Sequence, residues 1–316
     1  MNEMVVAVIL LLAGFVLLIK GADFFVEGSS SVAKRLRVPS IIIGLTIVAM
    51  GTSLPECAVS VTASLSGSNG LAISNAVGSN IFNLMVVCGF CSLFAPLTVQ
   101  KDTLKKEFPL SIICAVLLAG LGLWGMSVGR VDGICFIVIF LVYLIMMVLN
   151  ALKARKESAG QEQESTKMIP VWLCVVYILG GAAAIKFGGD FVVNGASTVA
   201  SKFGLSDTLI GLTIVSMGTS LPELVTSAVA AKKNEVDMAV GNVIGSNIFN
   251  ILLVLGIAGA ISPMAIVMEN IIDILVLIVM SAVVLLFANS KHKIERGEGI
   301  MMLVAYAVYM VYICIR

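Results

Sequence analysis

Two glutamates lie inside apolar stretches of the chain, each at the end of a duplicated motif. GLTIVAMGTSLPE occupies residues 44 to 56 and GLTIVSMGTSLPE occupies residues 211 to 223, with twelve of thirteen positions identical. Each copy ends in a proline and an acid, Glu56 or Glu223. A charged side chain at the bilayer centre costs roughly 2.5 to 3.5 kcal/mol on insertion scales, and such acids usually line a cavity or an ion pathway. The pair therefore indicates cation binding by a site that both copies build.

The proline in each copy predicts a break in the helix that carries the acid. Pro55 and Pro222 have no amide hydrogen, so the carbonyls of Gly51 and Gly218 lose their helical partners. At membrane depth an unpaired carbonyl is tolerated only where protein, water or an ion satisfies it.

Hydroxyl and amide side chains extend the set of oxygen donors. Thr52 and Thr219 stand one turn before the acids and share a helix face with them. Two polar stripes with a spacing of four residues follow on the next apolar segments: Asn75, Ser79 and Asn83, repeated as Asn242, Ser246 and Asn250. Taken alone, a stripe could be interhelical hydrogen-bond glue. Beside duplicated acids, we interpret both stripes as completing a hard-oxygen site of the kind that Ca²⁺ prefers, with 6 to 8 ligands.

Composition places this site in a membrane protein. The 316 residues are 59% hydrophobic and 12% charged, with a mean hydropathy of +1.08. A net charge of +1 argues against nucleic acid as a partner. We predict an all-α polytopic protein with ten transmembrane helices. They lie near residues 4–20, 39–65, 70–95, 108–127, 131–152, 170–187, 206–231, 236–262, 269–288 and 298–315.

The ten segments divide into two halves. Residues 1–150 and 170–316 each hold five spans, and the hydrophilic stretch 151–169 joins them. The motifs recur at an offset of 167 residues, and NAVGSNIFN at 75–83 meets NVIGSNIFN at 242–250. Because five is odd, the second half enters the bilayer upside down relative to the first. We therefore predict two inverted five-helix repeats, which are typical of secondary transporters.

Basic residues predict the orientation in the cell membrane. Alternate connections hold sixteen Lys and Arg on one side against four on the other. The positive-inside rule then puts both termini outside and the linker 151–169 in the cytoplasm. Asp23, Glu27 and Asp190 stand beside basic residues near the predicted helix ends, where we expect ion pairs.

The duplicated GTSLPE and GSNIFN resemble the repeats of the cation/Ca²⁺ exchanger superfamily, and most of all its prokaryotic sodium/calcium exchanger branch. The resemblance implies a ten-helix antiporter, not an enzyme, that works as a monomer, needs no cofactor and holds its ions between the second, third, seventh and eighth helices. It implies that the first and sixth helices slide across this core. It implies Ca²⁺ binding by Glu56, Glu223, Thr52 and Thr219, and help in Na⁺ binding from Ser53, Ser220, Ser79 and Ser246.

One position departs from the pattern. Family members often carry Asp where this chain has Asn250, and Asn83 is neutral as well. Two carboxylates neutralise one Ca²⁺ or two monovalent cations, and a third Na⁺ would leave one surplus charge. We therefore predict a secondary active antiporter that exchanges Ca²⁺ for Na⁺ by alternating access, with exchange of Ca²⁺ for H⁺ on the same site as the alternative. Because the two carboxylates also compete for protons, we expect acidification to inhibit transport.

Two rival functions use the same residues. A cation channel would also place acids and freed carbonyls in its pore, although the inverted repeat favours alternating access. An intramembrane hydrolase would use the acids as a catalytic dyad. Nothing else in the sequence supports an enzyme.

Overall fold

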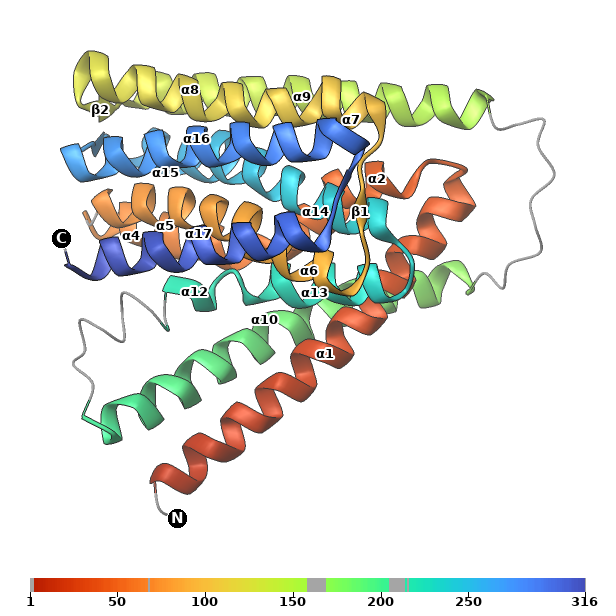
Figure 1. The fold of residues 1–316 in the computed structure, drawn as a ribbon, viewed down its shortest axis with the longest axis horizontal. Helices are drawn as coiled ribbons and strands as arrows, with labels where there is room; N and C mark the ends of the chain where they lie inside the picture. The colour runs from red at the N-terminus through yellow and green to blue at the C-terminus, as the bar shows by residue number, and fades with distance from the viewer. Residues whose placement is uncertain (1–2, 68, 158–168, 205–213, 215, 316) are drawn as a thin grey trace.

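The computed structural model describes residues 3–67, 69–157, 169–204, 214 and 216–315. These residues form a bundle of helices with two very short strand pairs (Figure 1). In the first half, the elements are α1 (Glu3–Leu36), α2 (Ser40–Ile43), the π-helical turn η1 (Gly44–Val48), α3 (Ala49–Thr52), α4 (Leu54–Leu65), α5 (Asn69–Phe82), the π-helical turn η2 (Asn83–Val87), α6 (Cys88–Phe94), β1 (Leu97–Thr98), α7 (Lys101–Lys105), α8 (Glu107–Gly125), β2 (Ser127–Val128) and α9 (Arg130–Glu157).

The second half contains matching elements at the same offset. They are α10 (Val171–Lys202), α12 (Ser216–Gly218), α13 (Leu221–Lys232), α14 (Val236–Phe249), the π-helical turn η5 (Asn250–Val254), α15 (Leu255–Ile261), β3 (Met264–Ala265), α16 (Met268–Lys291), β4 (Lys293–Ile294) and α17 (Arg296–Ile315). Helices α4 and α13 have twelve residues each, and η2 and η5 have five each.

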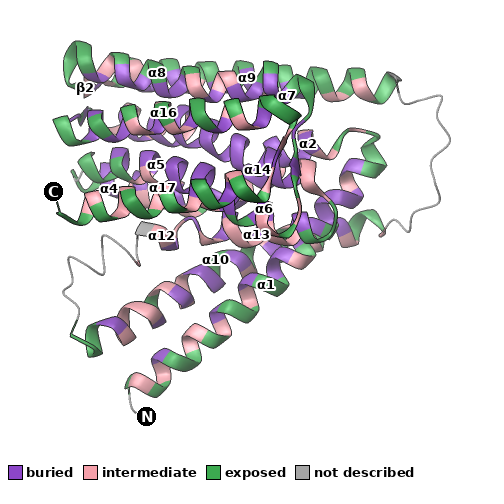
Figure 2. Cartoon of the chain, viewed as in Figure 1, coloured by how far each residue is buried: buried purple, intermediate pink, exposed green. Residues whose placement is uncertain are grey.

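Two continuous helical runs occupy the centre of the bundle. In the most apolar 18-residue window of Gly70–Phe94, 72% of the residues are buried, and in that of Val236–Ile261 the figure is 78%. The corresponding figure for α1 and for α10 is 22%. Figure 2 shows the same distribution, with buried residues concentrated in the middle and exposed ones on the outer helices. The two predicted polar stripes therefore lie on the most enclosed helices of the protein.

Helices α1 and α10 pack closely against each other in antiparallel orientation, at an incline to the rest of the bundle (Figure 1). Glycines seven residues apart form the contact: Gly14, Gly21 and Gly28 on α1, and Gly181, Gly188 and Gly195 on α10. A Cβ atom at Gly188 would lie 2.7 Å from the backbone nitrogen of Leu18, and one at Gly21 would lie 2.9 Å from Ala184 Cβ. Small residues let two membrane helices approach to this distance.

The first and sixth predicted spans were wrong at one boundary each. Instead of ending near residues 20 and 187, α1 continues to Leu36 and α10 to Lys202. A helix of 34 residues is about 51 Å long, well beyond a hydrocarbon core of about 30 Å. Lys20 and Lys186 therefore lie within helices and not in connections. Removing these two from the predicted connections leaves fifteen basic residues on one side and three on the other.

Eight described helices are long and apolar enough to cross a membrane, and the bent pair Ser40–Thr52 and Leu54–Leu65 makes a ninth. The predicted span 206–231 falls partly outside the described residues. The helical membrane architecture is thus confirmed, while the count of ten stays a prediction.

Two antiparallel strand pairs, not anticipated by the all-α prediction, tie the halves together. Leu97 pairs with Ile294, and Ser127 pairs with Ala265. Each pair joins one connection from the first half to one from the second.

Candidate functional site

Both proline motifs interrupt their helices, as predicted. Helix α3 ends at Thr52 and α4 begins at Leu54, with a bend of 47° between the two parts. In the second half, α13 begins at Leu221 after a turn. Proline fits the first turn of a helix because the amides there have no intrahelical acceptor.

The break also explains where the acids stand. Glu56 lies in the first turn of α4 and Glu223 in the first turn of α13. Unpaired amides and the helix dipole at an N-terminus favour a negative charge. The sequence motif predicts the interruption, and the interruption places each carboxylate at the positive end of a new helix.

The two carboxylates are linked by a reciprocal exchange of hydroxyl groups. Ser53 Oγ donates to Glu223 Oε1 at 2.7 Å, and Ser220 Oγ donates to Glu56 Oε1 at 3.1 Å. Both acids are fully buried. Since each serine stands three residues before the acid of its own half, the two acids lie close together at the junction of the halves.

The stripe serines reach the same carboxylates. Ser79 Oγ lies 3.3 Å from Glu56 Oε1 and 2.9 Å from Ser220 Oγ. Ser246 Oγ lies 3.5 Å from Glu223 Oε1. The structure therefore brings the four predicted serines and both glutamates into one cluster.

Four buried oxygen atoms of the two glutamates and of the last asparagine in each stripe have no protein donor in the described part of the chain. Among the described residues, no hydrogen-bond partner meets Glu56 Oε2, Glu223 Oε2, Asn83 Oδ1 or Asn250 Oδ1. Buried polar atoms are satisfied in the great majority of cases. Carboxylate and amide oxygens of this kind are ligands that a hard cation prefers.

The first asparagine of each stripe has a different role. Asn75 Nδ2 donates to Ser60 Oγ at 3.0 Å and to the carbonyl of Glu56 at 3.2 Å. Asn242 Nδ2 donates to Ser227 Oγ at 2.9 Å. These hydrogen bonds join α5 to α4 and α14 to α13. Asn75 and Asn242 therefore have the alternative role considered for the stripes, which is hydrogen bonding between helices.

The threonines do not occupy equivalent places. Thr52 is buried and its hydroxyl donates to Asn242 Oδ1 at 3.0 Å. Thr219 is half-buried and lines a cavity of about 560 Å³, and its hydroxyl has no partner among the described residues. The cavity breaks the symmetry between the halves.

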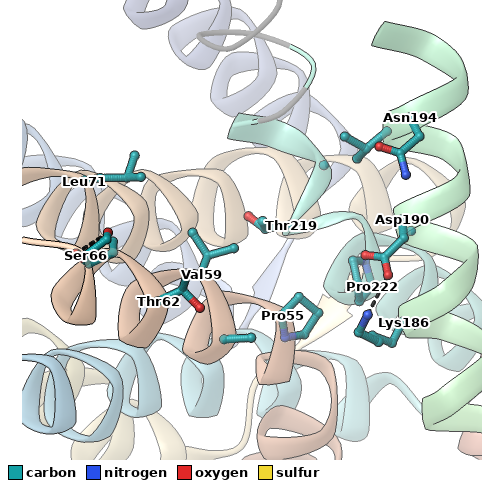
Figure 3. A pocket seen from close by; sticks show the side chains of 15 residues that line it. Pro55, Val59, Thr62, Ser66, Leu71, Lys186, Asp190, Asn194, Thr219 and Pro222 are labelled. Carbon is teal, nitrogen blue, oxygen red and sulfur yellow. Dashed lines mark hydrogen bonds and ion pairs between the residues drawn. The ribbon is translucent and has the colours of Figure 1, made fainter. Parts of the chain in front are cut away.

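This cavity lies between α4, α10 and the segment before α13 (Figure 3). Its polar side chains are Thr62, Ser66, Lys186, Asp190, Asn194 and Thr219. Lys186 Nζ contacts Asp190 Oδ2 at 2.5 Å on the α10 side. Both Pro55 and Pro222 line the cavity, so it reaches the two helix breaks that carry the acids.

At the position that corresponds to this cavity in the other half of the repeat, a lysine connects α13 to α1. Lys233 Nζ lies 2.6 Å from Asp23 Oδ1 and 3.5 Å from Glu27 Oε2, connecting the end of α13 to α1. Lys233 is the repeat equivalent of Ser66, which lines the cavity. The expected ion pairs are confirmed, but Asp23 and Glu27 lie within α1 and not near its end.

Sequence reasoning missed two asparagines, Asn80 and Asn247. Each has at most 1% of its surface exposed and lies beside the junction of the halves. They fall outside the four-residue stripes, which is why a search for a single helix face passes over them. Their presence in both copies of GSNIFN was the available signal.

A family model for the sodium/calcium exchanger protein matches residues 6–149 and 173–315. The chain belongs to this family. It is 42% identical to the proposed antiporter CaxA of Alkalimonas amylolytica, over 97% of this chain and 98% of that protein. It is 35% identical to the inner membrane protein YrbG of Escherichia coli strain K12, over 97% and 96%.

Solved structures of the same family share the architecture. A structure of the sodium-calcium exchanger NCX_Mj soaked with Na⁺ and Sr²⁺ matches with a TM-score of 0.84 and 33% identity, covering 98% of each chain. The predicted superfamily and the polytopic helical fold are therefore confirmed. The sodium/calcium exchanger family consists of transporters, in agreement with the prediction that the chain is not an enzyme.

Proposed function

We propose that the chain is a secondary active antiporter that exchanges Ca²⁺ for Na⁺ across a cell membrane by alternating access. The observation that carries the proposal is the reciprocal contact of Ser53 with Glu223 and of Ser220 with Glu56. It places two buried carboxylates, one from each half, at one point within an apolar bundle. Membership of the sodium/calcium exchanger family supports Ca²⁺ and Na⁺ as the transported ions.

In this proposal, Ca²⁺ is a substrate held by the unpartnered oxygens of the cluster. Glu56 and Glu223 supply the charge, and Thr52 and Thr219 supply hydroxyl or main-chain oxygens beside them. The four serines and the amide oxygens of Asn83 and Asn250 complete the Ca²⁺ and Na⁺ positions. Six to eight oxygens of this kind are what Ca²⁺ requires.

Access to the site alternates between two faces. The cavity at Thr219 reaches Pro55 and Pro222, each next to an acid in the chain, and lies toward the face that the distribution of basic residues puts outside. On the opposite face, Lys233 bridges α13 and α1. Since the halves are inverted repeats, exchange of their conformations would close the first path and open the second. We propose that the antiparallel pair α1 and α10 moves as a unit during this exchange.

Uptake of Ca²⁺ into vesicles with clamped voltage tests the coupling. An outward Na⁺ gradient should drive uptake if Na⁺ is exchanged. Uptake driven by a proton gradient alone would favour Ca²⁺/H⁺ exchange, which the two neutral amides leave open. Flux that needs no opposing gradient would indicate a channel and overturn the proposal.

The dependence of Ca²⁺ uptake on membrane potential measures the number of Na⁺ exchanged per Ca²⁺. Exchange of three Na⁺ for one Ca²⁺ moves one net positive charge per cycle. At 100 mV one charge corresponds to about 2.3 kcal/mol of driving force. A cycle with two Na⁺ would be insensitive to the clamped potential.

A further inference from the structure

A ring of four asparagine amides joins the two central helical runs. Asn80 and Asn83 come from the first half, and Asn247 and Asn250 from the second. All four side chains are at most 1% exposed. Asn80 Nδ2 donates to the carbonyl of Asn247 at 3.1 Å, and Asn247 Nδ2 donates to the carbonyl of Asn80 at 3.3 Å. Asn250 Nδ2 donates to Asn80 Oδ1 at 3.1 Å, and Asn83 Nδ2 donates to Asn247 Oδ1 at 3.3 Å.

The main chain determines the direction of every bond in this ring. The oxygen and nitrogen of an asparagine amide can usually be exchanged by a flip, and only the partners decide between the two orientations. A backbone carbonyl can only accept. The carbonyl of Asn247 therefore requires Nδ2 of Asn80, so Asn80 Oδ1 must face Asn250. Asn250 must then present its own nitrogen to Asn80, and its oxygen points elsewhere.

The same reasoning holds in the other half with the roles exchanged. The carbonyl of Asn80 requires Nδ2 of Asn247, whose oxygen then takes Nδ2 of Asn83. The oxygens left over are Asn83 Oδ1 and Asn250 Oδ1. Both are buried and have no hydrogen-bond partner among the described residues.

We propose that Asn80 and Asn247 are positioning residues that turn the amide oxygens of Asn250 and Asn83, and not their amide nitrogens, toward the transported cation. This inference rests on the proposed function. An amide nitrogen carries hydrogens that repel a cation, so a flipped Asn83 or Asn250 would remove a ligand and add a repulsive group. A carboxylate at position 250 would need no such control, because its two oxygens are equivalent. The ring therefore lets neutral amides serve where an acid would otherwise stand.

Each half orients one amide side chain of the other half. Asn80 orients Asn250, whereas Asn247 orients Asn83. Loss of one buried hydrogen bond of this kind corresponds to roughly a two- to twelvefold change in an equilibrium constant. We expect Asn80→Ala and Asn247→Ala each to raise the Ca²⁺ KM of reconstituted protein by about that factor, with a smaller change in kcat.

The decisive measurement is a double-mutant cycle. In an Asn250→Asp background, Asn80→Ala should no longer raise the Ca²⁺ KM, since Asn80 Oδ1 then faces a carboxylate that needs no orientation. Asn247→Ala should keep its full effect in that background, because it acts on Asn83. In an Asn83→Asp background we expect the reverse. Asn247→Ala should then no longer raise the Ca²⁺ KM, whereas Asn80→Ala should keep its full effect.

Equal effects of Asn80→Ala in both backgrounds would show a general packing role and overturn the inference. If Asn83→Ala and Asn250→Ala leave the Ca²⁺ KM unchanged, the proposed ion site itself is wrong. Should Asn80→Ala fail to accumulate as folded protein, Asn80→Ser serves in the same cycle. Serine also lacks the amide that orients Asn250, so Asn80→Ser should show the same dependence on the residue at position 250.

Discussion

Glu223→Gln should abolish high-affinity Ca²⁺ binding while leaving the protein folded. The side chain keeps its volume, and the amide can still meet the hydroxyl of Ser53, which lies 2.7 Å from Glu223 Oε1. What disappears is one of the two charges in the cluster. A pair of unit charges about 4 Å apart interacts by about 4 kcal/mol at an effective dielectric of about 20. Because Ca²⁺ carries two charges, this figure is a lower bound for its attraction to one carboxylate. Part of that attraction offsets the cost of removing water from the ion and the carboxylate. A loss of about 4 kcal/mol corresponds to roughly a thousandfold higher dissociation constant for Ca²⁺.

The same substitution should stabilise the ion-free protein. A buried carboxylate without a cation carries an uncompensated desolvation cost, and a neutral amide removes it. Wild-type protein should gain about 2.7 kcal/mol of stability at a Ca²⁺ concentration a hundred times its dissociation constant. Glu223→Gln should gain almost nothing from the same Ca²⁺ concentration. The two effects have opposite signs, which a simple folding defect would not produce.

Thermal unfolding of purified protein with and without Ca²⁺, together with titration calorimetry, measures both effects. Glu295→Gln is the matched control. Hydrogen bonds from Lys291 and Lys293 hold the pKa of Glu295 at about 2, so it is ionised at every working pH, and it lies between two helices far along the chain from the motifs. Its loss should change neither Ca²⁺ affinity nor the thermal shift. A dissociation constant for Glu223→Gln within tenfold of wild type would refute the assignment of Glu223 as a ligand.

Two further predictions follow from the cluster and from the opposite face. Acidification should raise the Ca²⁺ KM because protons compete for the two buried carboxylates, and saturating Ca²⁺ should restore the rate; uptake that is independent of pH down to strongly acidic conditions would contradict this. Lys233→Ala should loosen α1 from α13 by removing contacts to Asp23 and Glu27, each worth about 0.2 to 1 kcal/mol at a partly exposed site. Thiol labelling of a cysteine introduced as Val26→Cys should then be several-fold faster, and an unchanged rate would exclude Lys233 as a closing contact.

Local pattern predicted the parts of the site that depend on neighbours in the chain. Pro55 and Pro222 placed the helix breaks, since the loss of an amide hydrogen acts within one turn. The rarity of acids in apolar sequence identified Glu56 and Glu223, because burying a charge is costly in any fold. The offset of 167 residues related the two motifs and indicated two equivalent halves.

Contacts between distant residues could not be predicted in this way. Four-residue spacing grouped Asn75 with Ser79 and Asn83, yet Asn75 holds a neighbouring helix and Ser79 reaches the carboxylate. The pattern also missed Asn80 and Asn247, whose partners lie across the junction of the halves. The close packing of α1 against α10 likewise joins glycines from opposite halves of the chain.

By itself, the sequence determined that this is a helical membrane protein of a cation-exchanger type, with two acids at duplicated helix breaks. Those features follow from the cost of burying charge and from the missing amide of proline, both of which act locally. Only the tertiary structure decided that each acid takes its serine from the opposite half, that Thr219 faces a cavity while Thr52 is enclosed, and which atoms of the four central amides find a partner. These depend on how two similar halves pack against each other, and identical local sequences leave that packing undetermined.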